Sequence, residues 1–406
     1  MDYPKLRHGL EAVPVMQGGQ RFILLRDALG YSSQPLLLSA ALAPVLMHMT
    51  GQNSARDLQF YYMRATGQLL FSEQLEEILT KLDEHLFLDS ERFTQYVEQE
   101  VTRFRDAPVR PMQHAGVSYP RDAESARKEL ESYFTGLRNG GAAHEEATHP
   151  GRLLGLVAPH IDIKAGGACF ADAYKALSET SSPDVWVILG TGHSPAENYF
   201  ALTRKDFETP FGLVHCDGEF CDDLLRHAPK DLLASEYNHH REHTIEFQAL
   251  FLGYLQPAAR IIPILCSFSL EDWEQDRDYI DHIAALLREL AQSRERSVGF
   301  IASVDLAHIG PRYGDSFEPH AGTLAQHMAA DRDLLECLER CDAVGFMQKI
   351  QRDQNQRRIC GMAPLYVFAK ALESQARGKL LHHTHATVDS QQSFVTFASM
   401  AFHSIC

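Results

Sequence analysis

Residues 153–160 read LLGLVAPH, an apolar run that ends in a proline and a histidine. The same form returns at 185–193, VWVILGTGH, and at 297–308, SVGFIASVDLAH, while a fourth run, RIIPILC, occupies 260–266. Short runs that are apolar throughout are typical of strands buried on both faces of a parallel sheet. The prediction of the fold rests on these four stretches, and polar residues that can carry chemistry stand at their ends.

Helical segments alternate with these predicted strands. Amphipathic spacing predicts helices over residues 167–178, 217–227, 244–255, 271–292 and 320–340. Two late apolar runs, 379–388 and 393–402, are predicted to be strands that close the chain. The alternation predicts an α/β fold with a mainly parallel sheet covered by helices on both faces.

The first part of the chain, residues 1–105, has a different pattern and is predicted to form a separate small domain. We expect three short helices and a closing extended segment, a mostly helical module of the winged-helix type. Its last helices resemble those of PqqD-like peptide-chaperone domains. Because it lacks basic patches, the module is better suited to binding a protein partner than to reading DNA.

A linker is predicted between the two domains. Residues 106–117 contain two prolines and a glycine, which favours a connecting segment and leaves 118–406 for the α/β domain. The length of 406 residues also exceeds what one compact core usually supports, so two domains are expected.

Composition excludes several classes of function. The net charge of −16 disfavours binding to nucleic acid or to an anionic membrane, because like charges repel. No apolar run reaches the roughly 18 residues that a membrane-spanning helix needs, and the N-terminus has no signal-peptide pattern. The eight cysteines form no CxxC pair, as expected of reduced thiols. We therefore expect a cytoplasmic protein.

The strand ends collect histidines and a carboxylate. His160, His193, Asp305 and His308 follow three of the predicted strands, and the carboxyl ends of parallel strands share the edge where ligands bind. Imidazoles bind metals or transfer protons near neutral pH. One histidine after a strand is more often an ordinary loop residue, but three such sites on one edge indicate a shared functional site.

Two further groups of histidines carry weaker signals. His243 and Glu246 stand three residues apart at the predicted start of a helix, where both can face the same way. Glu242 alone is better interpreted as an acidic helix cap. Near the C-terminus, His383 and His385 share one face of a late strand, and exposed surface histidines are an equal alternative there.

Cys360 is a separate candidate, because it stands in the sequence ICGMAP at the predicted start of a helix. A thiolate would be favoured at such a position. A buried structural thiol is the other interpretation, and it is the more frequent one.

Several motifs together resemble one protein family. These are LVAPHIDIKAGG with His160, VILGTGHS with His193, EHTIEFQALFL with His243, SVDLAHIG with His308, and ICGMAP with Cys360. They occur in the order found in the Memo family, whose bacterial members are called AmmeMemoRadiSam system protein B. The resemblance covers roughly 70% of the chain, from about residue 118 to 402.

The resemblance implies a fold and a metal centre. The Memo family shares its fold with class III extradiol dioxygenases of the protocatechuate 4,5-dioxygenase type, which use non-haem Fe(II), two histidines and a carboxylate. It implies His160 and His193 as metal ligands, His308 with Asp305 as the acid/base group, and His243 with Glu246 as further catalytic residues lining the pocket.

The resemblance leaves the third metal ligand open. Animal members supply a cysteine before the last strand, but the corresponding stretch here, HATVDSQQSF at 385–394, contains none. His385 is taken as the third ligand, with Asp389 and Asp162 as alternatives.

The expected function is a redox or dioxygenase-type reaction on a small organic or peptide substrate. Fe(II) is the expected metal, copper is an alternative and zinc is less favoured. The resemblance also suggests radical-SAM and Ammecr1-like partners. A metal-binding or signalling scaffold without turnover is the rival interpretation, and a metal-dependent hydrolase is a third. The sequence identifies neither the substrate, the oligomeric state nor the role of the N-terminal module.

Overall fold

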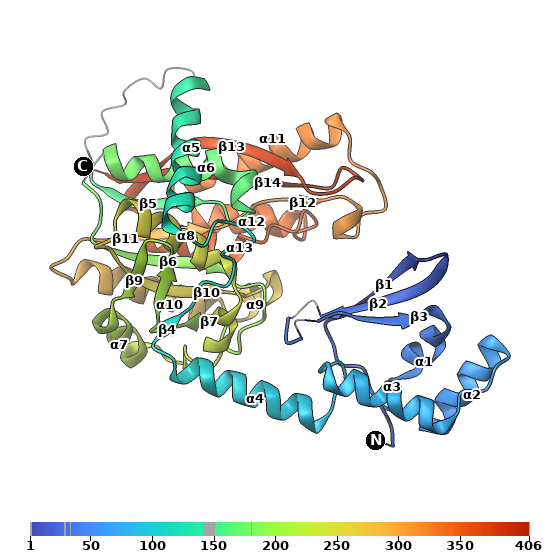
Figure 1. The fold of residues 1–406 in the computed structure, drawn as a ribbon. Coiled ribbons are helices and arrows are strands. Elements are labelled where there is room, and N and C mark those ends of the chain that lie inside the picture. The colour runs from blue at the N-terminus through green and yellow to red at the C-terminus, as the bar shows by residue number, and fades with distance from the viewer. Residues whose placement is uncertain (1, 28–29, 33, 141–150, 180, 406) are drawn as a thin grey trace. The chain divides into compact units, whose positions relative to one another are not determined.

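The chain divides into two units, residues 1–106 and 107–406, each with its own hydrophobic core (Figure 1). The structure is a computed structural model, and it describes residues 2–27, 30–32, 34–140, 151–179 and 181–405.

The first unit combines a small antiparallel sheet with helices. Strands β1 and β2 form a hairpin whose turn residues Gly18 and Gly19 both have positive φ, and β3 pairs with β2. The Ser54 capping box fixes the start of one helix. The elements are β1 (Leu10–Gln17), β2 (Gln20–Asp27), β3 (Leu36–Ser39), η1 (Ala40–Leu42), α1 (Ala43–His48), α2 (Ala55–Thr66), α3 (Ser72–Glu84) and α4 (Glu91–Asp106).

The hairpin corrects the predicted arrangement of this unit. Its strands mix charged, exposed and half-buried residues, so their short apolar stretches, such as FILL at 22–25, do not have the pattern of buried strands. The stretch PLLLSAALAPVLMHMT at 35–50, predicted to be one of the three helices, begins as β3 and becomes helical only from Ala40. That the unit is a winged-helix or PqqD-like domain stays a prediction.

The second unit is built on a large, mostly parallel sheet, as predicted. Its described strands form one eleven-stranded sheet in the order β12-β14-β5-β11-β6-β10-β9-β8-β4, with β13 beside β14 and β7 beside β10. The central strands β5, β11, β6 and β10 run parallel. The bounds are β4 (Val109–Arg110), β5 (Leu153–Ala158), β6 (Val185–Thr191), β7 (Phe200–Leu202), β8 (Asp206–Thr209), β9 (Gly212–Cys216), β10 (Arg260–Cys266), β11 (Val298–Ser303), β12 (His308–Ile309), β13 (Ala376–Thr387) and β14 (Phe394–Ser404).

Helices cover both faces of this sheet (Figure 1). One face packs on α5 (Ala123–Gly140), α6 (Ile163–Glu179) and α8 (His243–Leu255). The other face packs on α7 (Gly218–His227), α9 (Leu270–Gln275), α10 (Arg277–Gln292), α11 (Ala321–Glu339), α12 (Ala343–Arg352) and α13 (Met362–Ala371). The short 3-10 helices are η2 (Glu236–His240) and η3 (Pro311–Tyr313). None of the helices in the described ranges has the length and apolar character to cross a membrane.

The segment expected to be a linker is a packed part of the second unit. Strand β4 pairs with β8, and the Arg110 side chain is fully buried. Its guanidinium is paired with Glu246 and donates to the carbonyl oxygens of His239 at 2.9 Å and Glu242 at 2.8 Å. The prolines that suggested a linker flank a buried cation, which the local composition does not reveal.

The close approach of α8 to β6 requires a glycine at position 190. A Cβ atom there would lie 2.6 Å from Oγ1 of Thr244 and 2.8 Å from Cδ1 of Ile245. The missing side chain therefore lets the start of α8 rest on the end of β6. This contact brings His243 to the same edge of the sheet as His193.

We expect Gly190→Ala to destabilise the second unit, because the added methyl group must displace Thr244 and Ile245. The expected loss is about 1–3 kcal/mol in the free energy of unfolding, measured by denaturant unfolding monitored by circular dichroism. Gly136→Ala on α5 is the matched control, since a Cβ there meets nothing within 4 Å. Equal behaviour of the two variants would contradict the packing argument.

Candidate metal centre

Three histidines converge at the carboxyl edge of the sheet. His160 follows β5, His193 follows β6, and His243 is the first residue of α8. One ligand atom from each lies within 4.8 Å of the other two, and their ring centroids are 5.1–5.4 Å apart. Such a group has the residue types and the spacing that can hold a metal ion.

Protein oxygens orient the three imidazole rings. Nδ1 of His160 donates to the carbonyl oxygen of Ser303 at 3.0 Å, and Nδ1 of His193 donates to the Glu242 carboxylate at 3.1 Å. Nδ1 of His243 lies 3.1 Å from the same carboxylate. Each ring therefore has Nε2 left for a metal, which is the arrangement that outer hydrogen bonds give to metal-binding histidines.

Glu242 is the buried acceptor on which two of these rings depend. Its carboxylate also accepts the backbone N–H groups of His193 at 3.0 Å and His243 at 2.9 Å, so it caps α8 as well. Burial favours its neutral form, but hydrogen bonds and charge from His193 and His243 outweigh this and hold the pKa of Glu242 well below its usual range. The carboxylate is therefore ionised at neutral pH.

Burial differs among the three rings, and this decides where a ligand can enter. His160 is 3% exposed, and burial together with its histidine neighbours holds its pKa well below the usual value, so the ring is neutral. The side chain of His193 is 45% exposed. Solvent can therefore reach the centre from the His193 side.

Asp305 and Cys360 lie next to Nε2 of His160. Oδ2 of Asp305 is 3.6 Å from this nitrogen, and Sγ of Cys360 is 3.4 Å from it. Oδ1 of Asp305 accepts the backbone N–H of His160 at 3.1 Å, and burial raises the pKa of Asp305 to about 6. Burial also raises the pKa of the Cys360 thiol, which is protonated without a metal.

Gly361 lets the loop with Cys360 approach the sheet closely. A Cβ at this position would lie 2.6 Å from Cβ of Val304 and 2.7 Å from the carbonyl oxygen of Asp305. The loop before the last strand, where animal members of the resembling family have a cysteine, contains none. The structure supplies a cysteine from a different loop, the one before α13.

His308 is held beside the centre by backbone carbonyls. Its Nδ1 lies 3.1 Å from the carbonyl oxygens of both Leu306 and Arg358, so Nε2 is the nitrogen that can exchange a proton. Burial lowers the pKa of His308, and a positive His193 lowers it further. The ring is consequently neutral at physiological pH and able to accept a proton.

Glu246, expected to line the pocket, instead ties the segment before α5 to α8. It is 1% exposed, pairs with Arg110 and accepts the Tyr119 hydroxyl at 2.5 Å and the backbone N–H of His114 at 2.9 Å. This places the His114 ring 5.7 Å from that of His243. Glu246 therefore shapes the rim of the centre from a buried position.

The three alternatives for the third ligand are engaged elsewhere. His385 is exposed on β13, with its ring 6.2 Å from that of Phe394, and it is not among the clustered histidines. Asp162 accepts the backbone N–H of Lys164, and Asp389 accepts those of Gln391 and Ser393. His243, predicted as a catalytic residue, stands in the position expected for His385.

A cleft of about 840 Å³ adjoins the centre. Gly192 and Cys360 contribute to its wall, and much of the remaining lining is polar, including Glu271, Gln354 and Asn355. Its size is in the range of about 300–1,000 Å³ that suits a small molecule.

Sequence reasoning missed the roles of Glu242, Cys360 and His114. Glu242 precedes a helix, so it was interpreted only as a cap, although the histidine on its C-terminal side was a usable signal. Cys360 was weighed as a structural thiol because its nearness to His160 depends on a contact between residues 200 positions apart. His114 lay in the predicted linker and carried no signal.

The comparisons with known proteins agree on one family. Residues 110–401 match the family model described as Memo-like protein. A MEMO1 family protein of Aquifex aeolicus is 28% identical over 95% of this chain and 96% of its own length. One from Methanopyrus kandleri is 30% identical over 71% of this chain and 96% of its own length, and one from Thermus thermophilus is 26% identical over 80% and 92%.

Glu242→Gln should lower the pKa of His193 in the metal-free protein. Burial lowers this pKa, but the hydrogen bond and charge of Glu242 outweigh burial and leave it above its usual value. Without the negative charge, burial should bring it below the ordinary value of about 6.5. Titration of the ring nitrogens by NMR measures the change. The pKa of His327, whose charged neighbours include Arg357 and Asp331 but neither Glu242 nor His193, is the internal control and should not move. An unchanged His193 pKa would contradict this account.

Proposed function

This chain belongs to the Memo family, and we propose that it is a non-haem metal protein that performs a redox reaction of the dioxygenase type. The observation that carries the proposal is the convergence of His160, His193 and His243, with Nδ1 of each ring beside a protein oxygen. The substrate is a small organic molecule or a peptide side chain that fits the adjoining cleft.

The donor set fits a borderline transition metal. Imidazole nitrogens suit iron, copper and zinc, and a nearby carboxylate adds the oxygen donor found in non-haem Fe(II) sites. Asp305 and Cys360 lie beside Nε2 of His160 and offer an oxygen and a sulfur as further ligands. We propose Fe(II), with copper as the alternative and zinc as the less fitting choice. When bound, the metal would supply redox and Lewis-acid chemistry toward O2 and the substrate.

The surrounding residues would position the reactants and move a proton. Glu242 holds the rings of His193 and His243, while Asp305 fixes the backbone at His160. His308 is neutral and would accept a proton from the substrate at Nε2. The half-exposed face of His193 would admit the substrate.

The first unit would serve recruitment of a partner. Its core is separate from that of the second unit. By the resemblance to the AmmeMemoRadiSam system, we propose a radical-SAM or Ammecr1-like protein, or a peptide, as the partner.

Metal analysis tests the centre directly. Wild-type protein purified without added metal or affinity tag should contain about one equivalent of iron or copper, and His160→Ala/His193→Ala should lose it. His385→Ala is the matched control, because it removes an exposed imidazole outside the cluster. Absence of metal from the wild type, with no anaerobic uptake of Fe(II), would reject the redox proposal and favour a scaffold.

His308→Ala should retain the metal and lose turnover. Removing a positioned acid/base group lowers rates by about 10²–10⁴-fold, measured as O2 consumption by the Fe(II) protein with a catechol probe such as protocatechuate. Metal content measured on the same samples is the control. Anaerobic hydrolysis supported by Zn²⁺ would favour a hydrolase instead, and metal binding without any substrate-dependent consumption would favour a scaffold.

A further inference from the structure

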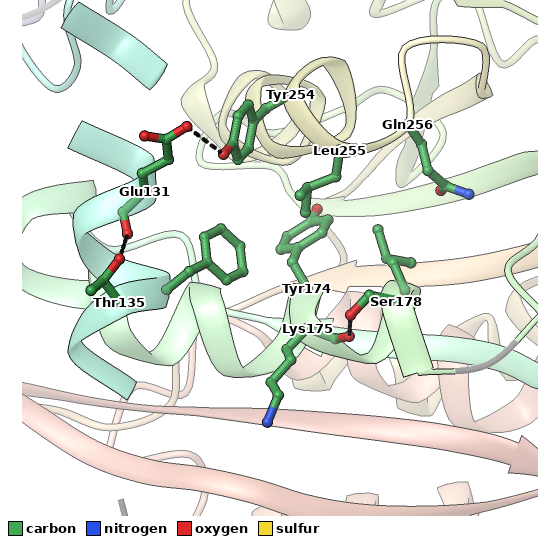
Figure 2. Close-up of a pocket in the computed structure, with 10 residues that line it drawn as sticks. Glu131, Thr135, Tyr174, Lys175, Ser178, Tyr254, Leu255 and Gln256 are labelled. Atoms are coloured by element: carbon green, nitrogen blue, oxygen red, sulfur yellow. Dashed lines mark hydrogen bonds between the residues drawn. The ribbon is translucent and has the colours of Figure 1, made fainter. Parts of the chain in front are cut away.

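A second cavity lies between side chains of the helices α5, α6 and α8 (Figure 2). Its volume is about 550 Å³, which suits a small organic ligand. Aromatic rings of Phe134, Tyr174 and Tyr254 form much of its wall, together with Leu177 and Leu255. A flat apolar molecule would find ring faces and aliphatic edges there.

The polar groups around the cavity mainly offer acceptors. The hydroxyls of Thr135 and Ser178 each donate to a backbone carbonyl at 2.8 Å, which leaves their oxygen lone pairs for a ligand. Glu131 adds a carboxylate at the rim that accepts the Tyr254 hydroxyl over 3.4 Å. Lys175 lines the edge, but its side chain extends away from the rings (Figure 2). The site therefore favours a ligand with hydrogen-bond donors.

The cavity wall is connected to the candidate metal centre by buried hydrogen bonds. The hydroxyl of Tyr174, a residue 1% exposed, donates to Oε1 of Gln248 at 2.8 Å. Nε2 of Gln248 donates to Oγ of Ser303 at 2.7 Å and to the carbonyl oxygen of Pro159 at 2.9 Å. Ser303 in turn accepts Nδ1 of His160 through its carbonyl, and Pro159 directly precedes that histidine.

These hydrogen bonds connect the cavity to His160, one of the three candidate metal ligands. Gln248 and Ser303 are both 0% exposed, so neither can exchange its partner for water without opening the core. A ligand that shifts the ring of Tyr174 must therefore shift Gln248, and with it the carbonyl groups on either side of His160.

We propose that this cavity binds a primary arylalkylamine and that its occupancy is transmitted to His160 through Tyr174, Gln248 and Ser303. The ring would pack among the three aromatic side chains. The ammonium group would pair with the carboxylate of Glu131 on α5. The transmission rests on the proposed metal function, whereas the binding itself does not.

Calorimetric titration of the metal-free full-length protein with tryptamine tests the binding. We expect saturable binding that is at least about tenfold tighter than that of indole-3-propionate, which carries the opposite charge. Glu131→Gln should remove this preference. Glu124→Gln, at another exposed position of α5, should bind as the wild type does. Absence of saturable binding, or equal affinity in Glu131→Gln and the wild type, would overturn the proposal.

The transmission is tested by measuring Co²⁺ affinity with and without saturating tryptamine. Coupling should change the affinity of the wild type by about fivefold or more. Tyr174→Phe keeps the ring but removes the donor to Gln248, so it should bind tryptamine and show no coupling. An unchanged Co²⁺ affinity in the tryptamine-bound wild type would overturn the transmission. Failure of Co²⁺ to bind at all would reject the metal function and leave the calorimetric result standing.

Discussion

The carboxylate of Glu242 receives hydrogen bonds from two separate parts of the chain. It accepts backbone N–H groups after β6 and at the start of α8, and it orients the His193 ring. Burying this ionised carboxylate without hydrogen-bond donors would cost free energy, and without the carboxylate the donors would have no acceptor. Loop, helix and imidazole are thus fixed together, so the geometry of the centre follows from capping this one helix.

The loop that precedes α13 also supports the candidate metal centre. Its backbone carbonyls hold the N–H and the ring of His308, and it brings Cys360 against His160. The buried Arg357–Asp331 ion pair, at 2.6 Å, anchors the loop to α11. His308 and Cys360 therefore both depend on this loop, and a shift of the loop would move both at once.

Much of the second unit could be predicted from sequence because its buried parallel strands are short apolar runs that alternate with amphipathic helical segments. The edge that gathers His160, His193 and His308 followed from those runs. The hairpin of the first unit has half-exposed strands with only short apolar stretches, so the same signal is weak there. Two contacts of the centre do not follow from the runs. Cys360 reaches His160 across 200 residues, and His243, which the family resemblance alone placed in the pocket, reaches the centre because Gly190 admits α8.

The buried pair of Arg110 and Glu246 also fixes where this protein can be dissected. Residues 110–119 belong physically to the second unit, since Arg110 supplies the cation that pairs with Glu246, a carboxylate inside its core. A fragment that starts after Tyr119 would leave that carboxylate buried without its guanidinium or phenol. A portion that folds as the Memo domain therefore has to include Arg110, so the boundary cannot be placed after the proline-containing segment 106–117 that composition marks as a linker.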